Sequence, residues 1–220
     1  MAETDKTEAE LLAELRAAHG DIEALRLESG AVVALRKPTL AEYLDAAEAF
    51  ARLGSGQILK DPGILTKPLL ALVVHGMDDA KAELKDCPGF DFDLYKSVKL
   101  LAGEGDEVEF KEAPDAVTPE AAAASSRAIA FRCNGTVVCA RPFDRFDWVR
   151  YQGMNAAAPV DLSRKVLAEV AEQQVIEAKD AQGRKPNYDA LTARWPAVAV
   201  ALGLQLVNRA SSKAKRIEGK

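Results

Sequence analysis

Two short stretches of the chain alternate apolar and polar residues around a glycine, and they predict two β-hairpins. The first is LRLESGAVVALR, residues 25–36, which turns at Ser29-Gly30. The second is AIAFRCNGTVVCAR, residues 128–141, which turns at Asn134-Gly135. A period of two residues is typical of a half-buried strand, and Asn-Gly is the strongest short signal for a hairpin turn. A two-residue turn there sets residue 133 opposite 136 and residue 139 opposite 130.

Each predicted hairpin leads into the start of a predicted helix. Thr39 and Glu42 have the spacing of a capping box, in which a hydroxyl and a carboxylate accept hydrogen bonds from free backbone N–H groups. Asp144 stands at the same place after the second hairpin, and Asp147 adds negative charge to the first turn. Both hairpins are therefore expected to continue directly into a capped helix.

Further apolar segments predict that most of the chain is helical. After the first hairpin come TKPLLALVVHG (66–76), which we expect to be a helix ending at Gly76, and PGFDFDLYKSVKLLAG (88–103). After the second come a longer helix at 161–183 and PNYDALTARWPAVAVALG (186–203). Segments 88–103 and 186–203 align through a shared proline, aromatic residue and aspartate. Pro196 should break or kink the final helix.

A separate helix is predicted ahead of the first hairpin, in TEAELLAELRAAHG. Thr7 and Glu10 form another capping box. The apolar stripe of this helix must be buried against its own domain or against a partner. The stripe consists of Leu11, Leu12 and Leu15.

The two halves of the chain resemble each other when Gly30 is aligned with Gly135. We predict an α+β fold, mainly helical, with two similar modules that each hold a β-hairpin followed by about three helices. The expected organisation is an N-terminal helix at 1–20, a first module at 21–112, a linker at 113–127 and a second module at 128–220. EVEF, within the acidic stretch ahead of this linker, could add an edge strand to the first module. Coincidence between two small α+β units is the alternative to a duplication.

Charge is distributed unevenly over these halves. Residues 1–112 hold 13 Lys and Arg against 23 Asp and Glu, a net charge of −10, and residues 113–220 hold 16 against 11, a net charge of +5. This asymmetry reflects either ordinary solvated helix faces or an attraction, between the halves or head to tail between neighbouring molecules. The 48% hydrophobic content is ordinary for a globular protein. No apolar run reaches the roughly 18 residues of a membrane helix, and no signal layout opens the chain, so we expect a cytoplasmic protein without membrane contact.

Chemistry-bearing residues are sparse. Cys87, Cys133 and Cys139 do not describe a disulfide framework, and Cys133 and Cys139 are expected to be small buried hydrophobes. His19 and His75 are expected at helix C-termini, and neither has a second ligand at metal-binding spacing. No nucleophile motif accompanies either histidine. We therefore expect no catalytic residues, no cofactor and no metal.

Three short motifs have structural explanations. GSGQ (54–57) lacks the Gly-Lys-Ser/Thr ending of a phosphate-binding loop, and FDFD (90–93) is explained by capping at a helix start. The basic stretch NRASSKAKRIEGK (208–220) could contact phosphate, but the acidic chain makes nucleic-acid binding unlikely to be its role, and a solvated helix end is favoured.

Aromatic residues crowd around the start of the helix after the second hairpin. They are Phe143, Phe146, Trp148 and Tyr151. Phe143 and Trp148 have the spacing of a hydrophobic staple, but Phe146, Trp148 and Tyr151 spread around a helix and cannot all share one face. Those that stay exposed are candidate anchors for a protein partner, and burial of all four in the core is the alternative.

The run GAVVALRKPTLAEYLDAAEAF, residues 30–50, is similar to a pattern in the small tail-assembly chaperones of tailed bacteriophages. VVCARPFDRFDWV, residues 137–149, is a looser copy, and the two-module arrangement departs from the family's usual single small domain. The resemblance implies a protein without enzymatic activity. Such chaperones bind the long helical tape-measure protein, keep its apolar stripes from aggregating until tail tube subunits assemble around it, and are usually absent from the finished particle.

The resemblance implies a location in the host cytoplasm and a partner among phage tail proteins, including the tape-measure protein. The residues we expect to bind it are Phe146, Trp148, Tyr151, Tyr43, Leu11 and Leu15. Two alternatives stay open. One is a structural virion component of the tail, neck or baseplate that self-associates head to tail. The other is a small enzyme, whose signature would be carboxylates of perturbed pKa in a cleft shared by the two halves.

Overall fold

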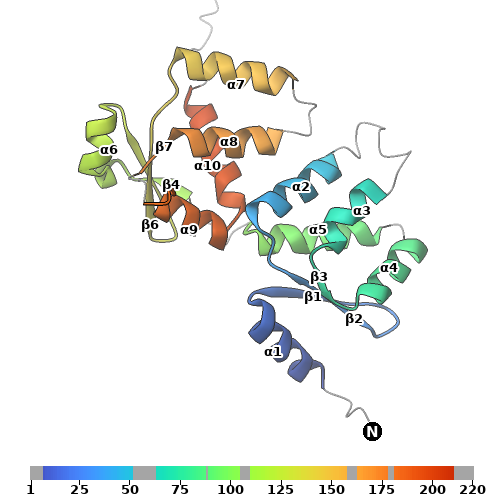
Figure 1. Cartoon of the computed structure of the whole chain (residues 1–220). Coiled ribbons are helices and arrows are strands. Elements are labelled where there is room, and N and C mark those ends of the chain that lie inside the picture. Colours follow the sequence, from blue (N-terminus) through green and yellow to red (C-terminus); the bar gives the residue numbers. More distant parts are fainter. Residues whose placement is uncertain are drawn as a thin grey trace, which may run out of the picture. The chain divides into compact units, whose positions relative to one another are not determined.

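A computed structural model describes residues 7–51, 63–87, 89–104, 110–157, 163–177 and 181–210 of the chain. The α+β class expected from the sequence is confirmed, since helices predominate and the strands form two small antiparallel sheets (Figure 1). The chain divides into two compact units. The N-terminal unit comprises Met1–Glu107 with Ala193–Ala197, and the C-terminal unit comprises Val108–Thr192 with Val198–Lys220.

The N-terminal unit packs helices against a three-stranded sheet of order β1-β2-β3. Its core contains Val33 and Leu35 of the central strand and Tyr43, Leu69 and Leu94 from the helices, all almost fully buried. The elements, in chain order, are α1 (Glu8–His19), β1 (Ile22–Arg26), β2 (Val32–Arg36), α2 (Leu40–Ala51), α3 (Gly63–Leu70), β3 (Val73–His75), α4 (Met77–Asp86) and α5 (Phe90–Leu101).

The C-terminal unit is built on a four-stranded sheet of order β4-β5-β6-β7. Phe131 and Val138 of its central strands and Val198, Leu202 and Leu206 of its last helix are buried in its core. The elements are β4 (Phe110–Glu112), a 3-10 turn η3 (Pro114–Ala116), α6 (Pro119–Ala124), β5 (Ile129–Cys133), β6 (Thr136–Ala140), α7 (Arg145–Ala157), α8 (Ser163–Gln174), β7 (Val175–Ile176), α9 (Pro186–Arg194) and α10 (Ala197–Ala210).

Both predicted hairpins form where the sequence places them. β1 pairs with β2 from Ile22↔Arg36 to Arg26↔Val32. In the second hairpin Cys133 lies opposite Thr136 and Cys139 opposite Ala130, which is the predicted register. Asn134 and Gly135 both have positive φ, 44° and 85°, as a two-residue turn of this kind requires.

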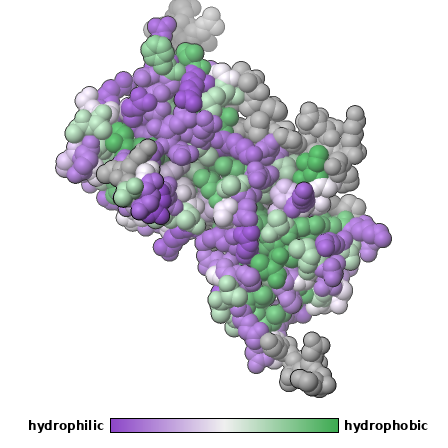
Figure 2. Space-filling view, in the orientation of Figure 1, coloured by the Kyte–Doolittle hydropathy of each residue, from purple (hydrophilic) through white to green (hydrophobic). Residues whose placement is uncertain are grey.

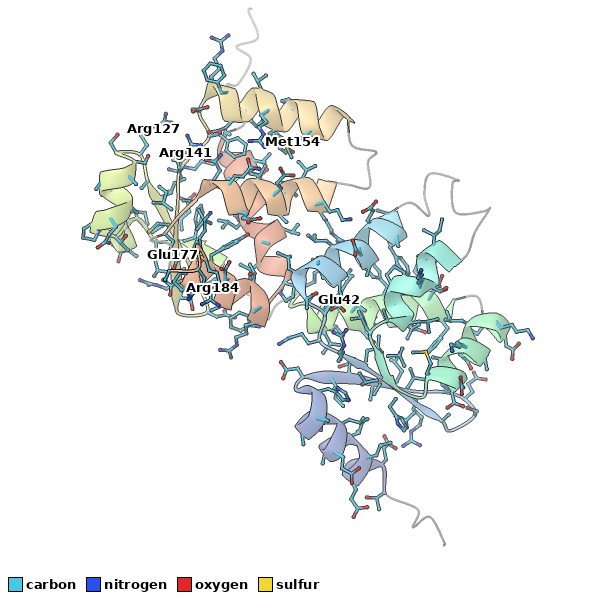
Figure 3. The ribbon with its side chains drawn as sticks, viewed as in Figure 1. Glu42, Arg127, Arg141, Met154, Glu177 and Arg184 are labelled. Atoms are coloured by element: carbon cyan, nitrogen blue, oxygen red, sulfur yellow. The ribbon has the colours of Figure 1, made fainter. Side chains whose placement is uncertain are left out.

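Both predicted helix caps also form. The Glu42 carboxylate accepts a 2.9 Å hydrogen bond from the Thr39 N–H, and the Glu42 N–H donates to the Thr39 hydroxyl at 3.3 Å. Asp144 and Asp147 exchange the same pair of bonds at 2.8 and 3.1 Å. Each hairpin also ends in an arginine that pairs with the cap, Arg36 with Glu42 at 2.6 Å and Arg141 with Asp147 at 3.1 Å. Figure 3 marks Glu42 and Arg141 at these two helix starts.

The segments at 66–76 and 161–183 are not continuous helices, contrary to expectation. α3 ends at Leu70 and α8 at Gln174, and each is followed by a short strand that pairs with the central hairpin strand of its sheet. The Leu72 and Gln174 carbonyls accept hydrogen bonds from the backbone N–H groups of Arg36 and Arg141 at 3.0 and 2.8 Å. His75 therefore lies in β3 rather than at a helix end.

The count of helices after each hairpin also differs from the expectation. Four of the described helices follow the first hairpin, α2 to α5, and four follow the second, α7 to α10, where about three were expected. By order, α4 corresponds to α9 and α5 to α10, so the alignment of 88–103 with 186–203 was shifted by one helix. Pro196 does break the last segment, because α9 and α10 meet there at 117°. The matching order of elements is what a duplication predicts, and the duplication stays a prediction.

The segment expected to be a linker, 113–127, is folded. It contains η3 and α6, and Ala121 of α6 packs with Ala130 and Cys139 on the second sheet. Phe110–Glu112, which contains the last residue of EVEF, pairs with β5 and not with the first sheet. An alanine-rich sequence was mistaken for a linker because alanine side chains can be buried without forming an obvious apolar stripe.

Candidate partner-binding surface

The start of α7 positions the aromatic residues singled out in the sequence. Phe143 is buried just ahead of the helix, and its ring lies 6.3 Å from that of Trp148 and 6.1 Å from that of Tyr151, centroid to centroid. Trp148 and Tyr151 are 5.6 Å apart and half-buried. Residues three apart lie on one side of a helix, so Trp148 and Tyr151 both reach back to Phe143. The predicted staple between Phe143 and Trp148 is consistent with this contact.

The opposite side of α7 presents apolar side chains to solvent. Phe146 is 86% exposed and Val149 is 63% exposed. They are again three residues apart and therefore neighbours on the helix surface. Of the candidate residues on this helix, only Phe146 is exposed, as an anchor for a partner would be. Trp148 and Tyr151 instead pack against Phe143 on the other side of the helix. Val149 was missed, although its spacing from Phe146 was a usable signal.

Tyr43 does not belong to an exposed surface. Its side chain is 1% exposed within the core of the N-terminal unit, and its hydroxyl donates a hydrogen bond to the Glu104 carboxylate. The Tyr43 ring lies in the interior of the unit, where α5 also packs against α2. As a partner-binding residue Tyr43 was a wrong choice.

Leu11 and Leu15 lie on α1, together with Leu12, and all three are half-buried. No residue of α1 is fully buried. The helix contacts β1, and Glu8 forms an ion pair with Arg26 at the end of that strand. The predicted capping box of Thr7 and Glu10 is present. The leucine stripe is thus partly covered by its own unit.

A second aromatic cluster lies in the N-terminal unit and was not predicted. Phe50, at the end of α2, stacks on Tyr95 of α5 at 4.0 Å and meets Phe92 edge-on at 5.4 Å. Lys99 lies 5.8 Å from the Tyr95 ring. Phe92 is 59% exposed. The motif FDFD contained this signal, since its two phenylalanines alternate with aspartates and cannot both be buried.

The visible surfaces of the two units differ in hydropathy. In the space-filling view, hydrophobic side chains gather on the face of the N-terminal unit, whereas the face shown of the C-terminal unit is mostly hydrophilic (Figure 2).

Among the described residues, four carboxylates have a shifted pKa. The Arg36 guanidinium lowers the pKa of Glu42 to about 2, and hydrogen bonds from Thr39 add to this effect. The Lys37 ammonium lowers the pKa of Asp21, and the Asp147 N–H lowers that of Asp144. Burial raises the pKa of Asp91. Glu42, Asp21 and Asp144 lie at caps or ion pairs of the fold, and Asp91 is buried in the first turn of α5, so these shifts have structural explanations.

Two cavities of the C-terminal unit are not lined by any of these four carboxylates. A wide cavity of about 850 Å³ has a mostly charged lining that includes Glu169, Glu172, Glu177, Arg184 and Lys185. A second of about 340 Å³ lies over Val137, Val138 and Ile176. Neither is lined by a residue with a shifted carboxylate pKa, so the enzyme hypothesis gains no support from them. Within the described ranges, no group of three His, Cys, Asp or Glu residues is placed to hold a metal ion.

The described part of the chain contains no single helix that is long and apolar enough to cross a membrane. Only α9 and α10 taken together reach that length and composition, and they are bent by 117° where they meet. Their apolar residues Leu191, Val198 and Leu202 are buried inside the protein.

No protein-family model matches the chain, and no curated protein and no solved structure is significantly similar to it.

Proposed function

We propose that the protein is a non-enzymatic phage tail assembly protein, a chaperone that binds a helical tape-measure-like partner through apolar helical surfaces in the host cytoplasm. The observation that carries the proposal is the exposed pair Phe146 and Val149 on α7. An exposed aromatic side chain held on a rigid helix is the usual form of an interface anchor. The resemblance of residues 30–50 to tail-assembly chaperones supplies the partner.

The architecture supports this role in two ways. The ring contacts of Phe143, Trp148 and Tyr151 hold α7 in place, so the helix that carries Phe146 and Val149 needs little ordering when a partner binds. The exposed aromatic cluster around Phe92 offers a second apolar surface on the same chain. Two surfaces on one chain would hold a long repetitive helix with greater avidity than either alone.

The test is capture of the partner during phage production. Tagged wild-type protein, Phe146→Asp and the control Leu204→Asp are purified from producing cells, and proteins in the eluates and in finished particles are quantified by mass spectrometry. Leu204 is an exposed leucine of α10 in the same unit and serves as a matched control. We expect wild type and control to capture a long helical protein of the phage, Phe146→Asp to capture much less, and the chain to be missing from particles.

A structural virion component is the second candidate, favoured by the opposite net charges of the two halves, which suit head-to-tail packing. Stoichiometric presence of the chain in particles would replace the chaperone proposal by this one. Capture of no phage protein, together with absence from particles, would overturn both.

A further inference from the structure

A small cavity in the N-terminal unit lies between the start of the hairpin and the end of α5. It has a volume of about 230 Å³ and is lined by Asp21, Glu23, Lys37, Leu100, Leu101 and Trp195. All six residues belong to the N-terminal unit. Cavities that hold drug-sized ligands measure about 300–1,000 Å³, so this one is of a size for a single large side chain.

The walls of the cavity are fixed by hydrogen bonds of the fold. Lys37 donates to the Asp21 carboxylate at 2.5 Å, and its backbone N–H donates to the Asp21 carbonyl at 3.1 Å. On the far wall the Ala197 N–H donates to the Ala102 carbonyl at 3.0 Å, which holds the segment containing Trp195 beside the end of α5. The cavity is therefore a preformed feature that requires little ordering to be filled.

Apolar groups in this cavity remain in contact with solvent. Leu100 is 49% exposed and Trp195 is half-buried, although both are large apolar side chains. Arg194 lies over the Trp195 ring at 4.3 Å from its centroid and covers one side of it. An apolar side chain entering the cavity would remove the remaining surface of Leu100 and Trp195 from water, which favours binding.

One acidic side chain at the rim of the cavity has no basic partner among the described residues. Asp21 is paired with Lys37, whereas Glu23 has no ion pair among the described residues. On α7 the opposite holds, because Arg145, next to Phe146, is exposed and has no ion pair in the described part of the chain. Counted over the two units, the net charges are −8 for the N-terminal unit, from 13 basic and 21 acidic residues, and +3 for the C-terminal unit, from 16 and 13.

We propose that this cavity receives Phe146 of a second copy of the protein. The phenyl ring would fill the space beside Leu100 and Trp195, and Arg145 of the incoming α7 would pair with Glu23. The donor surface and the receiving cavity are different parts of one chain, so the contact is heterologous and repeats head to tail. The unlike charges of the two units steer copies into this orientation. The inference concerns the protein alone and does not require the phage partner.

Sedimentation velocity of the purified full-length chain tests the proposal. We expect wild type to associate as its concentration rises, and more weakly as salt is added. Phe146→Asp and Leu100→Asp should each weaken association at least about tenfold, because an interface anchor or its pocket is lost. Leu204→Asp should associate as wild type does. All three positions are exposed, and circular dichroism checks that each variant is folded.

Mixing the two defective variants gives the decisive result. Phe146→Asp keeps an intact cavity and Leu100→Asp keeps an intact Phe146, so a mixture should form a dimer that cannot grow further. A monomeric wild type at every concentration would overturn the proposal, and so would a mixture that remains monomeric. If the sedimentation coefficient does not change with concentration while Phe146 is shielded from solvent, Phe146 docks within its own chain. That result also refutes self-association. Because no phage protein is present, failure here leaves the chaperone proposal to its own test.

Discussion

Replacement of Gly203 by alanine sets two opposing effects against each other. Gly203 lies in α10 where this helix passes the backbone of α8. A Cβ atom there would lie 2.0 Å from the Leu167 carbonyl oxygen and 2.9 Å from the Leu167 Cα, where ordinary contacts are 3.4–4 Å. Because these are backbone atoms, no side-chain rotation relieves the overlap, and the two helices must separate.

The magnitude follows from comparing the two effects. Alanine is more favourable than glycine inside a helix by about 1 kcal/mol. Forcing extra volume into a packed core costs about 1–3 kcal/mol, and occasionally more. An overlap this deep, against backbone atoms that cannot rotate away, belongs at the upper end of that range. We therefore expect Gly203→Ala to lower the free energy of unfolding of the C-terminal unit by about 2 kcal/mol.

The matched control is Gly153→Ala in α7. No atom lies within 4 Å of a Cβ placed at Gly153, so only the helix propensity acts. This variant should be more stable than wild type by about 0.5–1 kcal/mol. Urea unfolding followed by the fluorescence of Trp148, in a Trp195→Phe background, reports on the C-terminal unit alone. A Gly203→Ala protein as stable as wild type would show that the close approach of α8 and α10 is wrong.

Two further predictions concern titration and reactivity. The pKa of Glu42 is lowered to about 2 from an ordinary value of 4.5, so its contribution to stability is present above pH 4.5 and is lost as the pH falls from there towards 2. Glu42→Gln should remove about 1–2 kcal/mol of stability at neutral pH, after allowance for its partial exposure, and should flatten acid unfolding measured by circular dichroism; an unchanged acid limb would contradict the Arg36 pairing. In a thiol-labelling assay Cys87, which is exposed, should react in the folded protein, while Cys133 and Cys139 should react only after unfolding, and burial raises the pKa of the Cys133 thiol in the same sense. Rapid labelling of all three thiols in the native protein would argue against the second sheet.

Signals within a few neighbouring residues were sufficient to predict the hairpins and the helix starts. Asn134-Gly135 specifies a turn by its own backbone preference, and Thr39 with Glu42 specifies a helix start within four residues. Such interactions join neighbours in sequence and can be recognised there. The predicted register followed from the turn, because a two-residue loop leaves only one pairing.

The third strands could not be predicted in the same way. Val73–His75 is a strand because it pairs with β2, nearly forty positions earlier in the chain, and its two valines suit a buried helix as well as a strand. Val175–Ile176 at the end of an apparently continuous helix presents the same ambiguity. Pairing with a distant partner decided both segments.

Only part of the candidate surface could be predicted from the sequence, for a related reason. The spacing on α7 separates Trp148 and Tyr151 from Phe146, but it does not say which side of the helix is buried. Burial of Phe143 ahead of the helix decides that question, and the staple spacing with Trp148 already pointed to it. Tyr43 shows the limit of analogy between the halves, since an equivalent position became part of the core.

The placement of Ala193–Ala197 within the N-terminal unit has a consequence for synthesis on the ribosome. Domains usually fold in the order in which they emerge, N-terminal first. Here the N-terminal unit is incomplete until the wall of its cavity that contains Trp195 has been made. That wall is translated only after residues 108–192 of the other unit. The nascent N-terminal unit therefore carries an unfinished apolar edge beside Leu100 while residues 108–192 are translated, and it is completed only after most of the other unit has been made.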